Sequence, residues 1–226
     1  TRFKCDWSSD VCSSDLMRAV LTVIAALLAL PVGHAATAAR PNILLIVADD
    51  HGTDALGCYG NPVVRTPHLD ALAADGTRFT HAFCTTASCS PSRSVLLTGQ
   101  HGHRNGMYGL QHDMHHFESF AAVRSLPVRL AAGGYRTGRI GKFHVGPESV
   151  YAFQTVLSGG AANDPASLGR SPVEMADRTR DFIGDRDPRP FFLLFAVDDP
   201  HRGNIVLPDG RPSLDRKSTR LNSSHT

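Results

Sequence analysis

The sequence has little excess of charge of either sign. Its 226 residues include 23 Lys and Arg and 21 Asp and Glu, a formal net charge of +2 with the histidines neutral. So small an excess gives no reason to expect a nucleic-acid or membrane-surface partner. Internal repeats are absent, and the composition is not that of a disordered chain, because 42% of the residues are hydrophobic. The length indicates one folded domain or at most two.

The chain also lacks an apolar run long enough for a transmembrane helix, which needs about 20 residues. The run Ala19–Leu30 follows Met17 and Arg18 and precedes the small residues 36–38. A positive start, a short apolar centre and an Ala-x-Ala end are typical of a secretory signal peptide. We therefore predict a signal peptide at residues 17–38 and an exported protein, periplasmic or extracellular, without a stable membrane anchor.

Both ends of the sequence look foreign to the protein. Residues 1–16 are a polar leader that precedes a plausible initiator methionine, and residues 216–226 are polar without apolar periodicity. Both segments resemble translated sequencing-adapter read-through, so we interpret them as a non-native leader and a non-native tail. Residues 39–215 are the part that we expect to fold.

Cysteine is scarce outside the leader. Only Cys58, Cys84 and Cys89 remain, and an odd number leaves at least one cysteine outside any intramolecular disulfide. If Cys89 is chemically converted, Cys58 and Cys84 could pair, and two buried free thiols are the alternative. The sequence does not choose between these two states.

Strand and helix signals alternate along the chain. The apolar runs Ile43–Ala48 and Phe191–Val197 indicate buried strands, the first buried on both faces. Further strands are expected at residues 78–83 and 136–140. Proline near the start and glycine just past the end mark the helices. We expect helices from Pro67 to Gly76 with Leu69, Leu72 and Ala73 as the apolar stripe, from Pro91 to Thr98, from Leu126 to Ala132, and at a segment marked by Val173, Ala176 and Ile183.

This alternation predicts an α/β sandwich with a largely parallel central sheet flanked by helices. Ligands of such sheets bind beyond the carboxyl ends of the strands. Asp49, Asp50, Asp199 and His201 all fall at those ends. We therefore expect a site there.

The segment from Cys89 to Gly99, Cys-Ser-Pro-Ser-Arg-Ser-Val-Leu-Leu-Thr-Gly, is the most informative in the sequence. Pro91 suits the first turn of a helix, which places Cys89 at or just before the helix N-terminus. Unpaired backbone N–H groups favour an anion there. Arg93, one turn on, can face the same point and donate hydrogen bonds to it.

Here the chain resembles the type I, formylglycine-dependent sulfatases, whose signature C-x-P-S-R-x-x-L-L-T-G is matched at every fixed position. The resemblance implies an alkaline-phosphatase-like fold, with residues 39–215 as an incomplete N-terminal catalytic domain. It implies that a formylglycine-generating or anaerobic sulfatase-maturating enzyme oxidises Cys89 to formylglycine. In the family one hydroxyl of the hydrated aldehyde attacks sulfur, and deprotonation of the other expels sulfate. The alternative is a structural or disulfide cysteine in a helix-starting turn.

The same resemblance gives roles to the two aspartates. In the family such a pair binds a divalent cation, usually calcium, together with the formylglycine, which would make Asp49, Asp50 and Cys89 metal ligands. A second acidic pair completes the family's site, and it is missing from this sequence. Calcium takes about 6–8 oxygen ligands and two carboxylates supply at most four, so we expect poor metal binding by this fragment. By itself, an aspartate pair after a strand would better be interpreted as capping or solvated.

Two later elements match the family as well. Gly141-Lys142-Phe143-His144 matches G-K-x-H, which implies that Lys142 contacts sulfate and that His144 holds the formylglycine hydroxyl or takes its proton. His201 matches the D-P-H position and would lie by the sulfate or leaving group, where a general acid contributes about 10²–10⁴-fold. Taken singly, an exposed lysine, a core histidine and a turn histidine would be the ordinary interpretations.

Several stretches resemble the heparan N-sulfatase (sulfamidase) branch of the family, so an N-sulfoglucosamine-type glycan is the expected substrate. His115 is a candidate substrate-binding residue in a pocket rich in histidine, although a solvated loop or a stray metal-binding cluster explains His112, His115 and His116 equally well. The resemblance covers most of residues 42–202. Its stretches are Asn105–Leu110, the three histidines, Arg124–Pro127 and His144–Glu148.

Two other functions compete with this one. The first is an O-sulfatase or a related phosphoryl or phosphonate hydrolase, although those hydrolases often carry serine or threonine where this chain has Cys89. The second is a secreted glycan-binding pseudoenzyme, which the intact chemical residues disfavour. We expect the fragment by itself to be inactive.

Overall fold

The structure is a computed structural model, and it describes residue 20 and residues 40–112, 114–158 and 168–201. The chain divides into two compact units, Thr1–Ala39 and Arg40–Thr226. The predicted tail and all of the predicted signal peptide except residue 20 lie outside the described residues. No helix in the described ranges is long and apolar enough to cross a membrane.

A parallel sheet forms the centre of the second unit. Its strands are β1 (Ile43–Asp49), β2 (Arg136–Gly141), β3 (Thr155–Ser158) and β4 (Phe191–Pro200). Their order is β1-β4-β2-β3, and every pair is parallel. The predicted α/β class with a largely parallel sheet is therefore confirmed.

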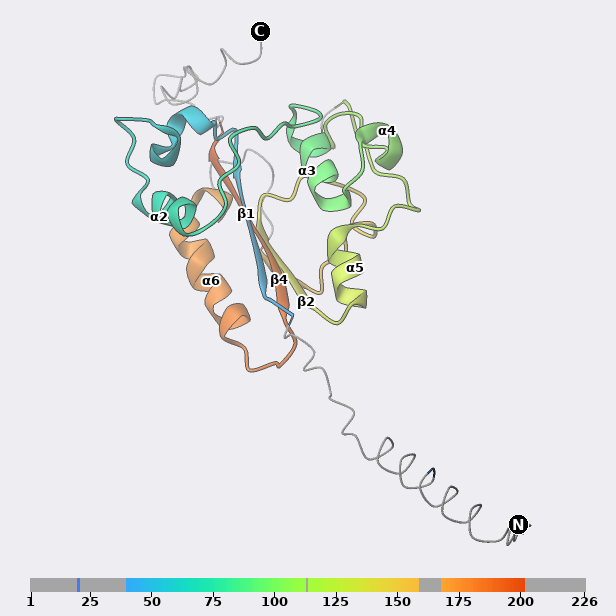
Figure 1. Cartoon of the computed structure of the whole chain (residues 1–226). Coiled ribbons are helices and arrows are strands. Elements are labelled where there is room, and N and C mark those ends of the chain that lie inside the picture. Colours follow the sequence, from blue (N-terminus) through green and yellow to red (C-terminus); the bar gives the residue numbers. More distant parts are fainter. Residues whose placement is uncertain (1–19, 21–39, 113, 159–167, 202–226) are drawn as a thin grey trace, which may run out of the picture. The chain divides into compact units, whose positions relative to one another are not determined.

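Helices lie on both faces of this sheet (Figure 1). They are α2 (Pro67–Asp75), α3 (Cys89–Thr98), α4 (Gly102–Asn105), α5 (Leu126–Ala132) and α6 (Pro172–Gly184). Short 3₁₀ helices occupy Thr53–Ala55, Gly57–Tyr59 and Leu168–Arg170. In Figure 1, α3 and α5 cover one face, and α6 lies on the other.

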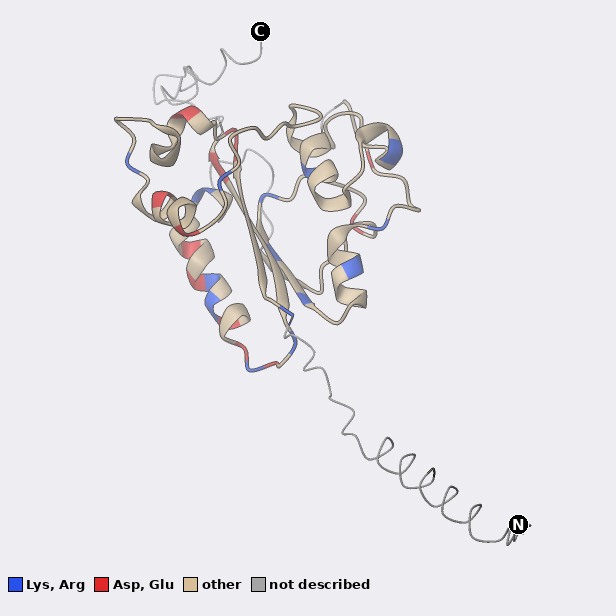
Figure 2. Ribbon diagram, in the orientation of Figure 1, with Lys and Arg blue, Asp and Glu red and all other residues tan. Residues whose placement is uncertain are grey.

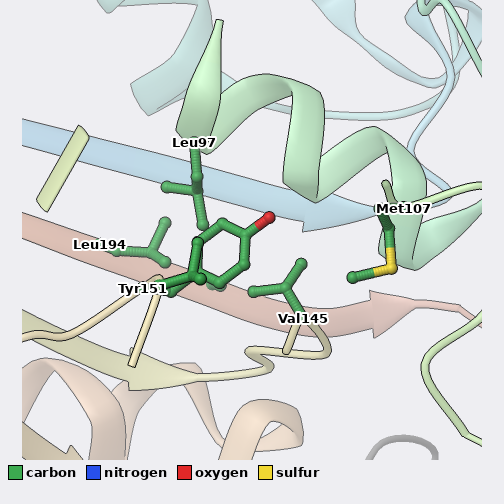
Figure 3. Packing of buried hydrophobic residues seen from close by; sticks show 7 residues of the cluster. Leu97, Met107, Val145, Tyr151 and Leu194 are labelled. Atoms are coloured by element: carbon green, nitrogen blue, oxygen red, sulfur yellow. The ribbon is translucent and has the colours of Figure 1, made fainter. Parts of the chain in front are cut away.

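Strand β4 supplies apolar side chains to both faces. Leu194 and Ala196 join Leu97 of α3 and the buried Tyr151 in the larger core (Figure 3). The remaining buried members of this core are Met107, Val145 and Val150. Phe191 and Leu193 pack instead with Phe182 of α6. Alternate residues of a strand point to opposite faces, so one continuous apolar run can fill two cores.

Two sequence expectations are wrong. Residues 78–83 form no strand and are exposed. The helix that Val173, Ala176 and Ile183 mark is present as α6. It buries Met175, Thr179 and Phe182, whereas Val173 and Ile183 are exposed. The apolar spacing was right for a helix, but the inward face is set by the contact with the sheet.

The second error concerns burial of β1, and α2 shows a similar exposure. Leu44 and Ile46 are 49% and 56% exposed, and since alternate residues share a face, one face of β1 is left uncovered by the described residues. Leu69 and Leu72 of α2 are also exposed. Helix α2 begins and ends where the sequence predicts, but its apolar stripe has no buried member.

Candidate active site

The residues singled out in the sequence come from four elements that meet at one end of the sheet. Strands β1, β2 and β4 all finish there because they are parallel, and α3 begins there. Figure 2 shows acidic residues where β1 and β4 end. This is the carboxyl edge at which α/β sheets bind their ligands.

Cys89 is the first residue of α3. Ser88 before it is extended, and the Ser92 N–H donates to the Ser88 carbonyl at 2.9 Å. The half-buried thiol of Cys89 lies 3.9 Å from Asp49 Oδ2 and 3.9 Å from Lys142 Nζ. Burial and then the Asp49 carboxylate raise the pKa of the Cys89 thiol. The unmodified side chain therefore stays a protonated thiol at neutral pH, which is a weak nucleophile.

Asp49 ends β1 as a buried carboxylate between two cations. Lys142 Nζ donates to its Oδ2, and Arg93 Nη2 lies 3.4 Å from its Oδ1. Burial would raise the pKa of Asp49, but the charges of Lys142 and Arg93 outweigh it, so the pKa is lowered. The carboxylate is thus ionised, and both cations are held beside Cys89.

A glycine turn places Lys142. Gly141 has φ +79°, and a Cβ there would lie 2.0 Å from the Ala196 carbonyl oxygen of β4. This close approach lets the Lys142 N–H donate to the same carbonyl at 2.9 Å. Arg93 Nη1 in turn donates to the Lys142 carbonyl at 2.8 Å. The contact with β4 therefore fixes the backbone at Lys142, and the Lys142 carbonyl in turn holds the side chain of Arg93 from α3.

His144, two residues further on, is buried with its backbone at φ +56°. Burial and then the charge of Lys142 lower the pKa of His144 to about 3, with smaller contributions from His112 and Arg93. The ring is therefore neutral at physiological pH. Its Nε2 contacts Nδ1 of His112, and the two rings stack with centroids 4.5 Å apart.

Asp50 and His201 complete the cluster at its exposed margin. Asp50 has φ +58°, and its Oδ2 lies 3.6 Å from Nε2 of His201. The ligand atoms of Asp49, Cys89 and His201 lie within 4.8 Å of one another, a spacing at which one metal ion can contact all three. Asp50, which the sequence also suggested as a ligand, is not one of these three residues, but it contacts one of them, His201.

A cavity of about 200 Å³ opens over Cys89. Asp49, Asp50 and Arg93 line it together with two residues that sequence reasoning missed, Cys84 and Ser92. The Cys84 thiol lies 3.1 Å from Ser92 Oγ, and Ser92 is one turn after Cys89, a spacing that could have suggested Ser92. A larger cavity of about 850 Å³ lies elsewhere, around Cys58, and contains none of the expected residues.

Other expectations about side chains have mixed outcomes. His115 is exposed and is not among the residues that line the cavity over Cys89. Cys58, Cys84 and Cys89 are all free thiols. The contact between His112 and His144 was also missed, because the spacing of a loop histidine carries no signal for a partner 32 positions away.

Comparison with known proteins identifies the family that this chain matches. The family model described as Sulfatase matches residues 41–218. Human N-sulphoglucosamine sulphohydrolase is 50% identical over 165 residues, which are 73% of this chain and 32% of that protein. N-acetylglucosamine-6-O-sulfatase of Bacteroides thetaiotaomicron is 32% identical over 189 residues, 75% of this chain and 32% of the relative. The chain thus spans about a third of the length of these curated relatives.

A solved structure gives the same result for the fold. It is a protein in complex with its substrate D-glucosamine-2-N,6-O-disulfate, and it superposes with a TM-score of 0.60 at 30% identity. The match covers 75% of this chain and 36% of that one.

Proposed function

The chain belongs to the sulfatase family, and we propose that the whole protein is a hydrolase that removes sulfate from glycans through a nucleophile made from Cys89. One observation carries the proposal. The Cys89 side chain lies at a helix N-terminus, 3.9 Å from both a buried carboxylate and a buried ammonium group. Its raised thiol pKa argues against direct attack by sulfur and for conversion of the side chain.

Conversion by a formylglycine-generating or anaerobic sulfatase-maturating enzyme would supply hydroxyl groups at this position, one of which attacks sulfur. Residues of this chain already form a positively charged site around this position. Lys142 and Arg93 present two fixed positive charges, held by Asp49 and by backbone contacts. Fixed charges aimed at an anion stabilise the transition state without a cost of reorganisation.

A divalent cation, which we propose to be calcium, fits the oxygen donors at this edge. Asp49 is ionised, and the Cys89 side chain within 3.9 Å of it would offer oxygen instead of sulfur once oxidised. Asp50 lies at the same strand end and is a further carboxylate ligand in our proposal. When bound, calcium would polarise the sulfate group. The ammonium group of Lys142 on Asp49 Oδ2 leaves mainly the other lone pairs of that carboxylate for the metal.

Two histidines would handle protons. His144 is neutral and buried beside Lys142, so it can hold or accept the proton of a hydroxyl at position 89. His201 lies at the exposed side near Asp50, which suits a group that meets the substrate and donates a proton to the departing sugar. Lys142 and His201 are thus substrate contacts in this proposal. His115 lies on an exposed loop and would take part only with a glycan that extends over that loop.

We propose N-sulfoglucosamine of heparan-type chains as the substrate. The support is the 50% identity to human N-sulphoglucosamine sulphohydrolase. An O-sulfated sugar is the second candidate, because a relative named N-acetylglucosamine-6-O-sulfatase also aligns with 75% of the chain. A related phosphoryl or phosphonate hydrolase and a glycan-binding pseudoenzyme remain the alternatives that an assay must separate.

The proposal also assigns a role to each segment of the chain. We propose that residues 17–38 direct export to the periplasm or beyond, that 39–215 form the N-terminal part of the catalytic domain, and that 1–16 and 216–226 are not native. N-terminal sequencing of the secreted protein tests this, and a mature chain that retains residues 1–38 would contradict it.

The function is tested on the full-length protein produced together with a maturing enzyme. Mass spectrometry of the peptide that contains Cys89 should show its CH2SH side chain replaced by an aldehyde group, CHO, or by the hydrate of that aldehyde. Release of inorganic sulfate should then be faster from N-sulfoglucosamine than from glucosamine 6-O-sulfate. A phosphate monoester is the third substrate, and release of inorganic phosphate from it should be slower than either. An intact thiol with glycan binding but no turnover would favour the pseudoenzyme. Residues 39–215 alone should release no sulfate, and full turnover by that fragment would contradict the proposed need for the remaining ligands.

A further inference from the structure

His112 and His144 form a pair that the proposed chemistry does not yet use. Nδ1 of His112 contacts Nε2 of His144, and the rings stack at 24° with centroids 4.5 Å apart. A contact between two ring nitrogens requires that one carries hydrogen and the other a lone pair. The contact therefore couples the tautomers of the two rings. Hydrogen on Nε2 of His144 is favoured, because hydrogen on its Nδ1 would be a buried donor without a partner among the described residues.

The two rings differ in their surroundings. His144 is 8% exposed, and Lys142, Arg93 and His112 all act on it as positive or potentially positive neighbours, with Asp49 as the opposing charge. Its Nδ1 is buried without a hydrogen-bond partner among the described residues. His112 is only half-buried, on the segment after α4. A proton that reaches His144 is thus unstable there, whereas His112 is nearer to solvent.

We propose that His112 is a positioning residue that accepts the Nε2 hydrogen of His144, so that Nδ1 of His144 presents its lone pair to the hydroxyl at position 89 and His112 carries the proton onward. This inference rests on the proposed function.

The proton balance of the step is simple. The hydroxyl O–H bond breaks, and the proton bonds to Nδ1 of His144. The N–H bond at Nε2 of the same ring breaks, and that proton bonds to Nδ1 of His112. His144 is neutral before and after, so no positive charge stays on the ring that burial and the charges of Lys142 and Arg93 keep neutral. The electron pair left on the oxygen forms the bond to sulfur, and the bond from sulfur to the sugar breaks as His201 donates a proton to the leaving group. The half-buried His112 then releases a proton to solvent. The pair is reset when water takes the proton from Nδ1 of His144 and His112, protonated again from solvent, returns one to Nε2.

The first test does not depend on catalysis. In the full-length protein labelled with ¹⁵N-histidine, ring nitrogen shifts should show His144 protonated at Nε2 and bare at Nδ1 at neutral pH, with the His144 signals assigned through their loss in H144Q. In H112F this tautomer preference should weaken, because the acceptor is gone. A His144 ring protonated at Nδ1 in the unaltered protein overturns the inference, whether or not the protein is a sulfatase.

The second test separates transfer from mere support. H112Q keeps an oxygen acceptor for Nε2 but cannot pass a proton, so kcat should fall by roughly 10- to 100-fold with KM unchanged, part of the ~10²–10⁴-fold that acid–base catalysis contributes. In H112A, added imidazole should restore rate. H103Q, which alters an exposed histidine of α4, is the matched control and should keep kcat.

These outcomes are distinguishable from a failure of the proposed function. If the unaltered matured protein releases no sulfate from any substrate, the proposed function fails, and the inferred relay fails with it even where the NMR finds the predicted tautomer. If the protein is active and H112Q keeps its kcat, or imidazole fails to rescue folded H112A, the relay is wrong while the function stands.

Discussion

Helices α2 and α3 have the same start and stop signals in their sequences but differ in how far they are buried. Both have proline in the first turn and a glycine directly after the last residue. Helix α3 buries Ser90, Pro91, Arg93, Ser94 and Leu97, whereas no residue of α2 is buried. The segment around α2 leaves Phe79 and Phe83 69% and 88% exposed. Local sequence therefore decides where a helix begins and ends, and contact with the sheet decides whether it can hold charged groups in place.

The largest effect should come from the glycine that places Lys142. In G141A a Cβ would meet the Ala196 carbonyl at 2.0 Å in a backbone with φ +79°, so we expect a loss of about 2–5 kcal/mol in the free energy of unfolding. G60A near α2 has φ +98° but open space and should lose about 1–2 kcal/mol. Chemical denaturation of the full-length variants measures both, and equal losses would show that the close approach is unimportant.

The next effect compares one leucine from each helix. Leu97 is 1% exposed and lies in the larger core, so L97A should destabilise the protein by about 2–5 kcal/mol. Leu72 of α2 is 66% exposed, and L72A should change stability by no more than about 0.5 kcal/mol. A loss in L72A as large as in L97A would mean that α2 is buried in the full-length protein by residues beyond the described ranges.

A smaller effect should appear on acidification. The folded pKa of His144 is about 3, below the ordinary 6.5, so the unfolded chain binds this proton more readily. The contribution of His144 to the free energy of unfolding is fully present above pH 6.5. It falls as the pH drops toward 3, by at most about 1.4 kcal/mol per pH unit. Denaturation between pH 6.5 and 4.5 should show a shallower slope in H144Q than in H103Q. An unchanged slope in H144Q would contradict the burial of a neutral ring.

The smallest effect concerns an exposed ion pair of α6. Arg178 and Glu174 are four residues apart with N and O 2.6 Å apart, and both side chains are about half exposed. Such pairs contribute about 0.3–0.5 kcal/mol, so E174Q should barely shift the denaturation midpoint. A loss above about 1 kcal/mol would show that α6 is held by more than its inward face.

Much of the fold could be predicted from the chain alone. The runs around Ile43 and Phe191 gave two strands, and proline and glycine gave the limits of α3 and α5. Strand β3 was missed, because Thr155–Ser158 is too short to show a period. The exposed face of α6 and the absence of a strand at 78–83 were not predictable, because both depend on what lies opposite.

The candidate site likewise has a part that the sequence predicts and a part that only the structure shows. Asp49, Cys89, Arg93, Lys142 and His144 converge as their motifs suggested, since each motif is rigidly joined to a strand end or a helix start. Their ion pairs and the lowered pKa of His144 required the structure, because charge and burial at a point depend on residues distant in sequence. The His112–His144 contact and the place of His201 beside Asp50 belong to this second class.

The most direct measurement is sulfate release by the full-length, matured protein and by its C89A variant, both shown to be folded by their denaturation midpoints. C89A removes the oxidisable side chain and little else, so its kcat for N-sulfoglucosamine should fall to the uncatalysed background while the parent protein turns over. Sulfate release by folded C89A at a rate near that of the parent would contradict the account, because the nucleophile would then have to be another group.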